Sequence, residues 1–586
     1  MNKYCADVLR LIRSSGFTNQ RDFALKTGFS LGKINQSLTK LIDEGYLETD
    51  KTVTEKTRIL FEKCKPKNAI ILAAGYGLRM VPLNTEIPKG LLEVNGEPLI
   101  ERTIKQLHEK GIVNIYIVVG YQKEKYEYLM DLYDVELIVN MNYSIRNNLH
   151  SLKKAEQYLG NSYIIPCDLY SVSNPYHEYE LYDWYMVSNR ETLKSSVRQN
   201  RYNELVSIPS TESGNAMLGI SYLSMNTAEK MKETMTKWCM NPAFDQFFWD
   251  DALFATPDIT IYSNLVDQSE VTEIDTFEQL RVLDSTSEQL NTSAIRIIEE
   301  TFHVSLNEIT NIETLKKGMT NRSFLFTLHG DRYIMRIPGE GTDMLINRKE
   351  EADVYTTLSG LDICDDVLYI NPANGYKITR FLEGARNCDP SDENNLKLCM
   401  KKLKGFHEQN LQVKHEFDIW GQIDYYEHLW NGRKSMYRDY LQTKEHVLSL
   451  RKYIDAQPKK SCLAHIDAVP DNFLILDNTE MNIRLIDWEY AGMQDPQVDI
   501  AMFCIYSLYN RTEVDHLIDI YFEDMCLPEI RIKIYCYIAA CGLLWSNWCE
   551  YKSILGIEFG EYALRQYRYA KDYYKIALEE MENLKK

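Results

Sequence analysis

The chain has 586 residues, of which 45% are hydrophobic and 26% charged, so intrinsic disorder and collagen-like repeats are excluded. At about 100–200 residues per domain, the length predicts three to five domains. The formal charge of −19 excludes a protein that coats nucleic acid along its length. The charge is uneven, because residues 1–67 carry a net +5 and the remaining 519 residues carry −24.

No membrane span or export signal is predicted. The longest strongly apolar stretch, residues 534–545, has twelve residues, fewer than the roughly 20 that a spanning helix needs. Asp7, Arg10 and Arg13 interrupt any apolar core of a signal peptide. The thirteen cysteines are odd in number and form no CxxC pair, so we expect reduced thiols in a cytoplasmic protein.

Residues 1–62 are predicted to form short amphipathic helices, with Thr18 and Ser30 as N-caps. The run 19–46 is typical of helix, glycine turn and helix, and "GYLETDKTVTEKTR" follows like a small β-wing. This pattern resembles the winged helix-turn-helix family, whose second helix faces the major groove of DNA. The side chains presented there would be Lys33, Asn35, Gln36 and Lys40. Packing on a neighbour or dimerisation is the favoured interpretation of this module, because a net charge of +5 is modest for operator binding.

Residues 66–285 contain apolar runs without polar alternation, which is typical of buried parallel strands. The runs are "NAIILAAG" (68–75), "IYIVVG" (115–120), "VELIVN" (135–140) and "YIIPCD" (163–168). Helical patterns at 98–110 and 150–159 accompany them, so we expect a Rossmann-like mixed α/β sheet with covering helices. The polar stretch 284–293 is predicted to be a linker.

The first of these strands runs into "LAAGYGLRM" (72–80), and "PKGLLEV" (88–94) follows. Gly75 and Gly77 let backbone N–H groups approach a phosphate, and Arg79 and Lys89 supply cations where a triphosphate would lie. A lone Gly-x-Gly is weak evidence, and the motif is neither G-x-G-x-x-G nor a P-loop. The whole arrangement resembles the sugar-nucleotide and cytidylyl transferase family, and within it the bacterial phosphocholine cytidylyltransferases, over roughly residues 68–285.

That resemblance implies CTP as a substrate, bound by the loop Leu72, Ala73, Ala74, Gly75 and Gly77. It implies Asp168 and Asp275 as Mg²⁺ ligands, with Arg79 and Lys89 stabilising the leaving pyrophosphate. Considered alone, Asp168 could cap a strand end and Asp275 could cap a helix. Glu273 and Asp250 would face the cationic head of phosphocholine.

One departure from the family concerns the choline cage. Where the family usually places a tryptophan, near residues 194–198, this chain has "KSSVR" with Ser195 and Ser196. We therefore expect the cage to use Phe248, Trp249 or Tyr170. The missing tryptophan keeps phosphoethanolamine open as the substrate.

From residue 295 to 586, short alternating strands precede long helices, which predicts a protein-kinase-like α+β body of two lobes. "LAHIDAVPDNFLIL" (463–476) contains H-x-D-x-x-x-x-N, and "LIDWEYAG" (485–492) follows. Both resemble the choline and aminoglycoside kinase family. The resemblance implies that Asp467 accepts the proton of the substrate hydroxyl, that Asn472 and Asp487 hold Mg²⁺, and that His465 is structural.

The smaller lobe supplies the predicted ATP site. "LKKGMTNRSFLF" (315–326) resembles the family's nucleotide loop, with Gly318, Thr320 and Asn321 over the phosphates. Arg336 stands where most kinases have lysine, and we favour Glu351 over Glu350 as its partner. "YKITRFLEG" (376–384) resembles the hinge that receives adenine, with Phe381 in it.

The C-terminal segment 543–570, "LLWSNWCEYKSILGIEFGEYALRQYRYA", resembles the end of choline kinases. Trp545 and Trp548 are three residues apart and so share a helix face. The resemblance implies that they wall a trimethylammonium pocket by cation–π attraction, completed by Tyr490 and Tyr567 and by the charge of Glu489. Considered alone, such a pair is more simply part of a core.

Together these patterns predict a bifunctional enzyme. One domain would phosphorylate choline with ATP, and the other would convert phosphocholine and CTP to CDP-choline and pyrophosphate. Two alternatives remain: the same steps on ethanolamine, and a DNA-binding regulator that senses these metabolites. Trp545 and Trp548 argue against ethanolamine, and the completeness of both catalytic sets argues against loss of activity.

Overall fold

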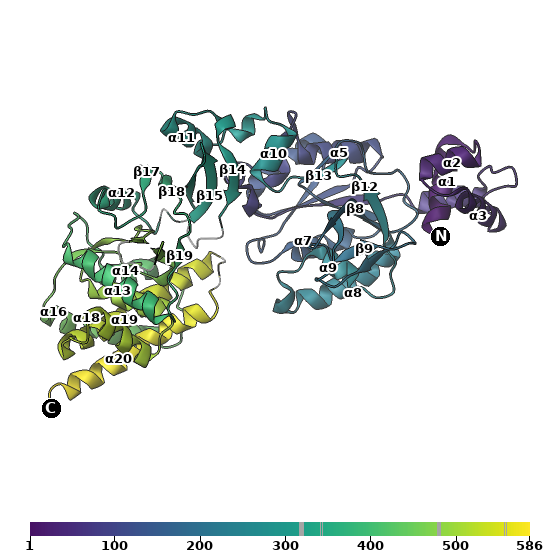
Figure 1. Ribbon diagram of the computed structural model, residues 1–586. Helices are drawn as coiled ribbons and strands as arrows, with labels where there is room; N and C mark the ends of the chain where they lie inside the picture. The colour runs from purple at the N-terminus through teal and green to yellow at the C-terminus, as the bar shows by residue number, and fades with distance from the viewer. Residues whose placement is uncertain (316–320, 340–341, 343, 478–481, 556, 558) are drawn as a thin grey trace. The chain divides into compact units, whose positions relative to one another are not determined.

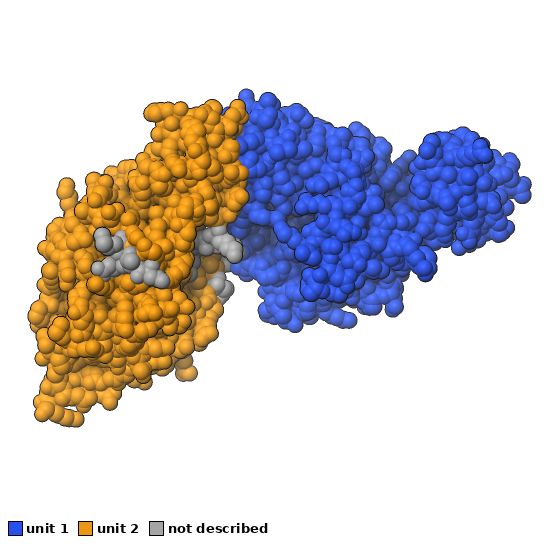
Figure 2. Space-filling view, viewed as in Figure 1, with its two compact units in different colours: residues 1–292 blue, residues 293–586 orange. Residues whose placement is uncertain are grey.

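The computed structural model describes residues 1–586 except 316–320, 340–341, 343, 478–481, 556 and 558. The chain divides into two compact units, residues 1–292 and residues 293–586 (Figure 2). Within the described residues, no helix combines the length and the apolar character that crossing a membrane requires.

Unit 1 begins with four helices, which we call the N-terminal module (residues 1–64): α1 (Lys3–Ser15), α2 (Gln20–Thr27), α3 (Leu31–Asp43) and α4 (Glu55–Lys63). Ser30 caps α3 as predicted, but Asn19 rather than Thr18 caps α2, because its carboxamide accepts the N–H groups of Arg21 and Asp22. Gly28 turns the chain between α2 and α3 with a positive φ of 71°. The predicted wing contains the β-bridge Leu47–Val53.

The rest of unit 1 is built on a seven-stranded mixed sheet in the order β12-β8-β11-β6-β1-β4-β5. Its strands are β1 (Asn68–Ala73), β4 (Ile115–Val119), β5 (Glu136–Val139), β6 (Ser162–Pro166), β8 (Trp184–Thr192), β11 (Gly214–Leu223) and β12 (Tyr262–Val266). The four apolar runs of the sequence form β1, β4, β5 and β6, which pair in parallel. The sheet is mixed because β11 is antiparallel to both of its neighbours, β6 and β8.

Alternate side chains of β1 enter two separate cores, one on each face of the sheet. Ile71 packs with α5 (Leu99–Glu109), whereas Ile70 and Leu72 pack with α7 (Asn148–Lys154), α8 (Met225–Cys239) and α9 (Trp249–Phe254). Figure 1 shows α5 on one side of the sheet and α7, α8 and α9 on the other. Covering helices on both faces explain why β1 shows no polar alternation.

Helix α1 is joined to the sheet domain by a buried ion pair. Arg10 lies 3.2 Å from Glu180, whose side chain is fully buried. Glu180 also accepts a hydrogen bond of 2.5 Å from the hydroxyl of Tyr163 on β6 and lies 2.9 Å from Nδ1 of His177. The N-terminal module is therefore anchored to a central strand through charge.

Unit 2 starts with α11 (Ser293–Phe302) and an antiparallel sheet in the order β14-β15-β16-β18-β17. The strands are β14 (Thr310–Thr314), β15 (Asn321–Leu328), β16 (Asp331–Pro338), β17 (Val367–Ile370) and β18 (Lys377–Arg380), with α12 (Arg348–Leu358) after β16. This small β-rich lobe agrees with the predicted kinase-like architecture.

The large lobe of unit 2 is helical. Its helices are α13 (Glu393–Glu408), α14 (Ile419–His428), α15 (Tyr440–Ser449), α16 (Arg451–Ala456), α17 (Gln497–Tyr506), α18 (Arg511–Phe522), α19 (Pro528–Ile554) and α20 (Glu561–Asn583). Helix α19 is buried along residues 532–552 and packs against α14, α17 and α20. The apolar stretch 534–545 is thus the centre of a core helix.

Candidate functional sites

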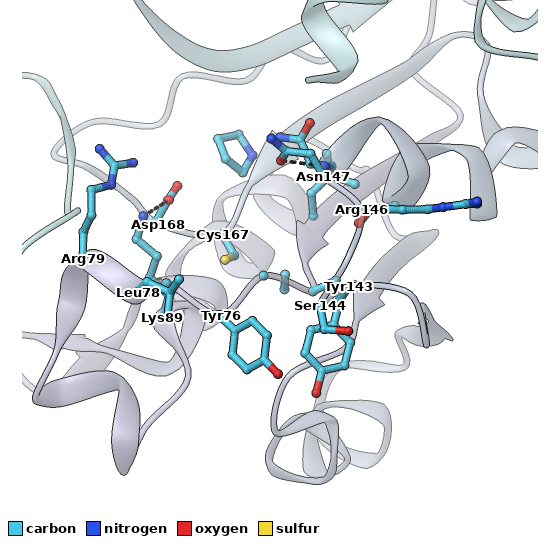
Figure 3. A pocket seen from close by; sticks show the side chains of 18 of the residues that line it. Tyr76, Leu78, Arg79, Lys89, Tyr143, Ser144, Arg146, Asn147, Cys167 and Asp168 are labelled. Carbon is cyan, nitrogen blue, oxygen red and sulfur yellow. Dashed lines mark hydrogen bonds and ion pairs between the residues drawn. The ribbon is translucent and has the colours of Figure 1, made fainter. Parts of the chain in front are cut away.

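A pocket of about 380 Å³ opens in unit 1 at the carboxyl ends of the neighbouring parallel strands β1 and β6 (Figure 3). Ligands of open α/β sheets bind at this edge. The predicted nucleotide residues all line it: Leu72, Ala73, Ala74, Gly75 and Gly77. Gly77 has a φ of 60°, so a side chain there would strain the loop, whereas a Cβ on Gly75 would meet only open space.

Two cations converge on the acidic wall of this pocket. The ammonium of Lys89 contacts the carboxylate of Asp168 and lies 2.5 Å from Oδ1 of Asp275, and Figure 3 shows its side chain directed at Asp168. The exposed guanidinium of Arg79 lies 2.8 Å from Oδ2 of Asp275. Burial by itself would lower the pKa of Lys89, but the two carboxylates raise it, so the ammonium remains charged.

Asp168, Glu273 and Asp275 form an acidic cluster whose oxygens lie within 4.8 Å of one another. A short ladder between β7 (Leu169–Ser171) and β13 (Val271–Glu273) brings them together, since Asp168 directly precedes β7 and Asp275 lies two residues after β13. Thr276, not Asp275, caps the following helix α10 (Phe277–Leu283), so Asp275 is available to the pocket. Burial, and then the charges of Asp168 and Asp275, raise the pKa of Glu273 to about 7. Oxygen donors of this kind fit Mg²⁺.

The predicted amine-binding residues are spread over different environments. Asp250 accepts a 2.8 Å hydrogen bond from the buried Tyr185, and burial raises the pKa of Asp250 to about 6. Both Asp250 and Glu273 raise the pKa of Tyr185 after burial, which puts the three groups in one electrostatic environment. Trp249 is 2% exposed and packs with Tyr185, whereas Phe248 is 51% exposed.

The structure adds lining residues that no motif had singled out. Tyr76 and Tyr143 face each other with ring centroids 5.1 Å apart, and Arg146 and Asn147 follow on the same segment (Figure 3). Tyr76 belongs to the glycine-containing motif 72–80, and the other three lie in the asparagine-rich segment 142–155. Tyr185 had no signal at all, because it is one aromatic residue in a buried strand.

In unit 2, the loop between β20 (Cys462–Ala464) and the turn Pro470–Asn472 carries Asp467. The carboxamide of Asn472 donates to Oδ2 of Asp467 over 3.0 Å. Burial, and then the charge of Glu489, raise the pKa of Asp467 to about 7. His465 lies 3.0 Å from the carbonyl of Ile486, and burial lowers the pKa of His465 to about 4. Its neutral ring therefore joins the loop of Asp467 to the loop that contains Ile486 and Asp487.

Asp487 stands in the second loop with a φ of 66°, an unusual conformation for a residue with a side chain. Burial and the charge of Glu489 raise the pKa of Asp487. Glu489 itself accepts a 3.0 Å hydrogen bond from Asn321 and lies 3.4 Å from Arg348. The carboxylate of Glu489, which was predicted to attract the substrate's amine, therefore also contacts Asn321 of the predicted nucleotide loop.

Arg336 of β16 forms a buried bidentate pair with Glu351 of α12. Nη2 of Arg336 also donates to the carbonyl of Gly375 over 2.8 Å, and Nη1 lies 3.8 Å from Oδ1 of Asp487. Phe381 follows β18, and the guanidinium of Arg332 stacks 4.1 Å from its ring centre. Gly318 and Thr320 lie outside the described residues.

An aromatic cluster forms around Tyr490 and the tryptophans of α19. The Tyr490 ring lies 5.4 Å from Trp545, Trp545 lies 5.6 Å from Trp548, and Trp548 lies 5.0 Å from Phe559. Tyr567 is placed elsewhere: it stacks on Tyr437 at 3.7 Å and donates to Asp439. Phe559 lies between α19 and α20, where helical spacing gives no signal for it.

Comparison with known proteins assigns the two units to different families. Residues 69–189 match the MobA-like NTP transferase domain, and residues 312–540 match the choline/ethanolamine kinase family. Over 220 residues the chain is 34% identical to choline-phosphate cytidylyltransferase of Streptococcus pneumoniae, covering 37% of this chain and 96% of the relative. It is 33% identical over 228 residues to 2-aminoethylphosphonate cytidylyltransferase of Lancefieldella rimae, covering 37% and 92%.

Among solved structures, choline kinase LicA from Streptococcus pneumoniae is 29% identical, with a TM-score of 0.43, and covers 48% of this chain and 98% of that chain. The two family matches fall in different units and do not overlap. The chain therefore belongs to the nucleotidyltransferases related to bacterial choline-phosphate cytidylyltransferase, and carries a choline/ethanolamine kinase domain after that transferase domain.

Proposed function

We propose that the chain makes CDP-choline in two steps, phosphorylating choline with ATP and then transferring a cytidylyl group from CTP to phosphocholine. The observation that carries the proposal is the pairing of two domains whose reactions are consecutive, since the product of a choline kinase is the substrate of a choline-phosphate cytidylyltransferase. A kinase for another class of substrate would leave the fusion without a chemical reason.

In the kinase step, Asp467 takes the proton of the choline hydroxyl. The hydroxyl oxygen attacks the γ-phosphorus of ATP, and ADP leaves. Tyr490, Trp545 and Trp548 hold the trimethylammonium group by cation–π attraction. The buried pair of Arg336 and Glu351 fixes a cation beside the nucleotide loop. Asn472 and Asp487 would hold Mg²⁺, which neutralises phosphate charge when bound.

In the transferase step, a phosphate oxygen of phosphocholine attacks the α-phosphorus of CTP and pyrophosphate leaves. This chemistry needs positioning and charge neutralisation more than a protein nucleophile. Lys89 and Arg79 supply cations for the leaving group. Asp168 and Asp275 would hold Mg²⁺, which offsets the charge of the phosphates when bound, and Asp250 and Glu273 would face the amine.

The substrate is argued from the two domains together. One relative of the transferase domain is named for 2-aminoethylphosphonate, in which phosphorus is bonded to carbon. A kinase that phosphorylates a hydroxyl produces a C–O–P ester and cannot form a C–P bond. The fusion therefore favours a phosphoester of an amino alcohol, and the two tryptophans of the kinase pocket favour choline over ethanolamine.

The test is a phosphorus NMR time course with choline, ATP, CTP and Mg²⁺, repeated with ethanolamine and with 2-aminoethylphosphonate. Wild type should yield CDP-choline, Asp168→Ala should stop at phosphocholine, and Asp467→Ala should need added phosphocholine. Turnover of ethanolamine without turnover of choline would overturn the assignment of the substrate but not of the catalytic residues. No turnover of any amine would overturn the proposal.

We propose a second role, duplex DNA binding, for the N-terminal module. Asn35, Gln36 and Lys40 on α3 are exposed while α1 contacts the sheet domain through Arg10. Amide side chains on the second helix of a helix-turn-helix, here α3 after α2, can reach base edges in the major groove. The net charge of residues 1–67, +5, is modest but has the sign that a phosphate backbone attracts.

Fluorescence anisotropy of a labelled duplex of about 30 base pairs tests this role between roughly 50 and 200 mM salt. Lys40→Gln should weaken binding and lower the salt slope by about 1, because one phosphate contact is lost. The matched control is Lys237→Gln, an exposed lysine of α8, which should bind like wild type. Absence of binding, or equal slopes in all three proteins, would refute DNA binding.

A further inference from the structure

A lysine lies against the aromatic cluster of the kinase domain. Lys552 follows Trp548 by four residues and Trp545 by seven on α19, so the three side chains share one face of the helix. The ammonium of Lys552 lies 5.5 Å from the ring centre of Trp548. Lys552 is 2% exposed, so nearly all of its side chain is covered by the protein.

The surroundings of this ammonium offer little compensation for its charge. Among the described residues, no carboxylate oxygen lies within 4.0 Å of it. Its partner is the ring of Trp548, by a cation–π contact. Burial lowers the pKa of Lys552, and the more distant charge of Glu489 opposes that shift. A cation on so buried a residue is costly without a carboxylate partner, so its retention beside two tryptophans calls for an explanation.

We propose that Lys552 competes with the substrate's ammonium group for Trp548 and is thereby a specificity-determining residue of the kinase site. The inference rests on the proposed binding of choline between Tyr490, Trp545 and Trp548. Two cations near one indole repel each other strongly in a poorly solvated pocket. A neutral molecule of the same shape escapes this repulsion. Lys552 therefore sets the affinity for charged amines without touching the reacting hydroxyl.

The experiment measures equilibrium binding to the full chain without nucleotide, by tryptophan fluorescence. The ligands are choline and 3,3-dimethylbutan-1-ol, which replaces the ammonium nitrogen by carbon and keeps the shape. Lys552→Met, which has similar length and no charge, should bind choline about tenfold more tightly or better. Its affinity for the neutral alcohol should stay within about twofold of wild type.

Three further proteins make the result decisive. Lys552→Gln should behave like Lys552→Met, which guards against a folding defect peculiar to one substitution. Lys552→Arg keeps the charge and should gain no affinity for choline. Lys575→Met removes the charge of an exposed lysine on α20 and should bind both ligands like wild type.

The outcomes separate this inference from the proposed function. If wild type phosphorylates choline but both neutral variants bind choline no more tightly than wild type, the role of Lys552 is refuted and the kinase assignment stands. If the variants gain affinity equally for choline and for the alcohol, packing rather than charge is responsible, and the inference is again refuted. If no protein binds or phosphorylates choline, the proposed function fails and the inference fails with it.

Discussion

The ammonium of Lys89 lies inside the acidic cluster formed by Asp168, Glu273 and Asp275. It therefore places a positive charge beside the carboxylates that we propose to hold a divalent cation. We expect Lys89→Met to bind Mn²⁺ more tightly than wild type in the absence of nucleotide, by about tenfold, because a like charge has been removed. Electron paramagnetic resonance of free Mn²⁺ measures this affinity.

The same substitution should lower cytidylyl transfer by about 100-fold or more, because the leaving pyrophosphate loses a cation. Lys105→Met is the control, since Lys105 pairs with Glu97 at 2.9 Å on an exposed surface. That variant should match wild type in both measurements. Weaker Mn²⁺ binding by Lys89→Met would show that the lysine organises the carboxylates instead of competing with the ion.

At the scale of elements, helix α1 is held to β6 by the ion pair of Arg10 and Glu180. Burial opposes ionisation of Glu180, but Arg10 outweighs it and keeps the pKa of Glu180 below its ordinary value. The carboxylate therefore stabilises the fold above about pH 4.5, and this stabilisation is lost as the pH falls through the folded-state pKa. Without Arg10, the buried charge would lose its main partner.

We expect Arg10→Met to lower the free energy of opening β6 by about 3–5 kcal/mol. Hydrogen exchange followed by mass spectrometry over residues 162–166 measures that free energy. Arg10→Met combined with Glu180→Gln should recover most of the loss, because no uncompensated charge is then buried. A double variant as unstable as Arg10→Met alone would mean that shape, and not charge, joins the module to the sheet.

Elements with a strong local signal could be predicted from the sequence. The run 115–120 became β4 and the helical pattern 98–110 became α5, because burial on both faces and a 3.6-residue period are properties of the local sequence. Lys89 and Asp168 were found as members of motifs. Glu180 gives no sequence signal, since it is a single charged residue whose role depends on contact with the remote Arg10. Lys552 gives none either, because the burial of its side chain depends on how α19 packs in the core. The antiparallel insertion of β11 likewise left no local signature.

At the scale of the whole molecule, the chain consists of two units with separate cores, and each unit contains one set of predicted catalytic residues. We expect an equimolar mixture of Asp467→Ala and Asp168→Ala chains to make CDP-choline from choline, ATP and CTP. Each chain would supply one intact active site, and phosphocholine would pass through solution. Phosphorus NMR should show a lag that lengthens as the protein is diluted.

Each single variant alone is the control and should make no CDP-choline from choline. A mixture that fails, although one chain phosphorylates choline and the other converts added phosphocholine, would contradict free exchange of the intermediate. It would instead require both sites in the same chain.

The ladder between β7 and β13 has a consequence for the order of folding. It pairs Leu169 with Glu273 and so joins segments about a hundred residues apart, and the aspartates at its ends complete the acidic cluster. Closing so long a loop costs entropy that only later contacts repay. During refolding, the parallel strands β1, β4 and β5 can assemble from nearer neighbours first. Capacity to hold a divalent cation should therefore return late, and it would report that the transferase domain has closed this long-range contact.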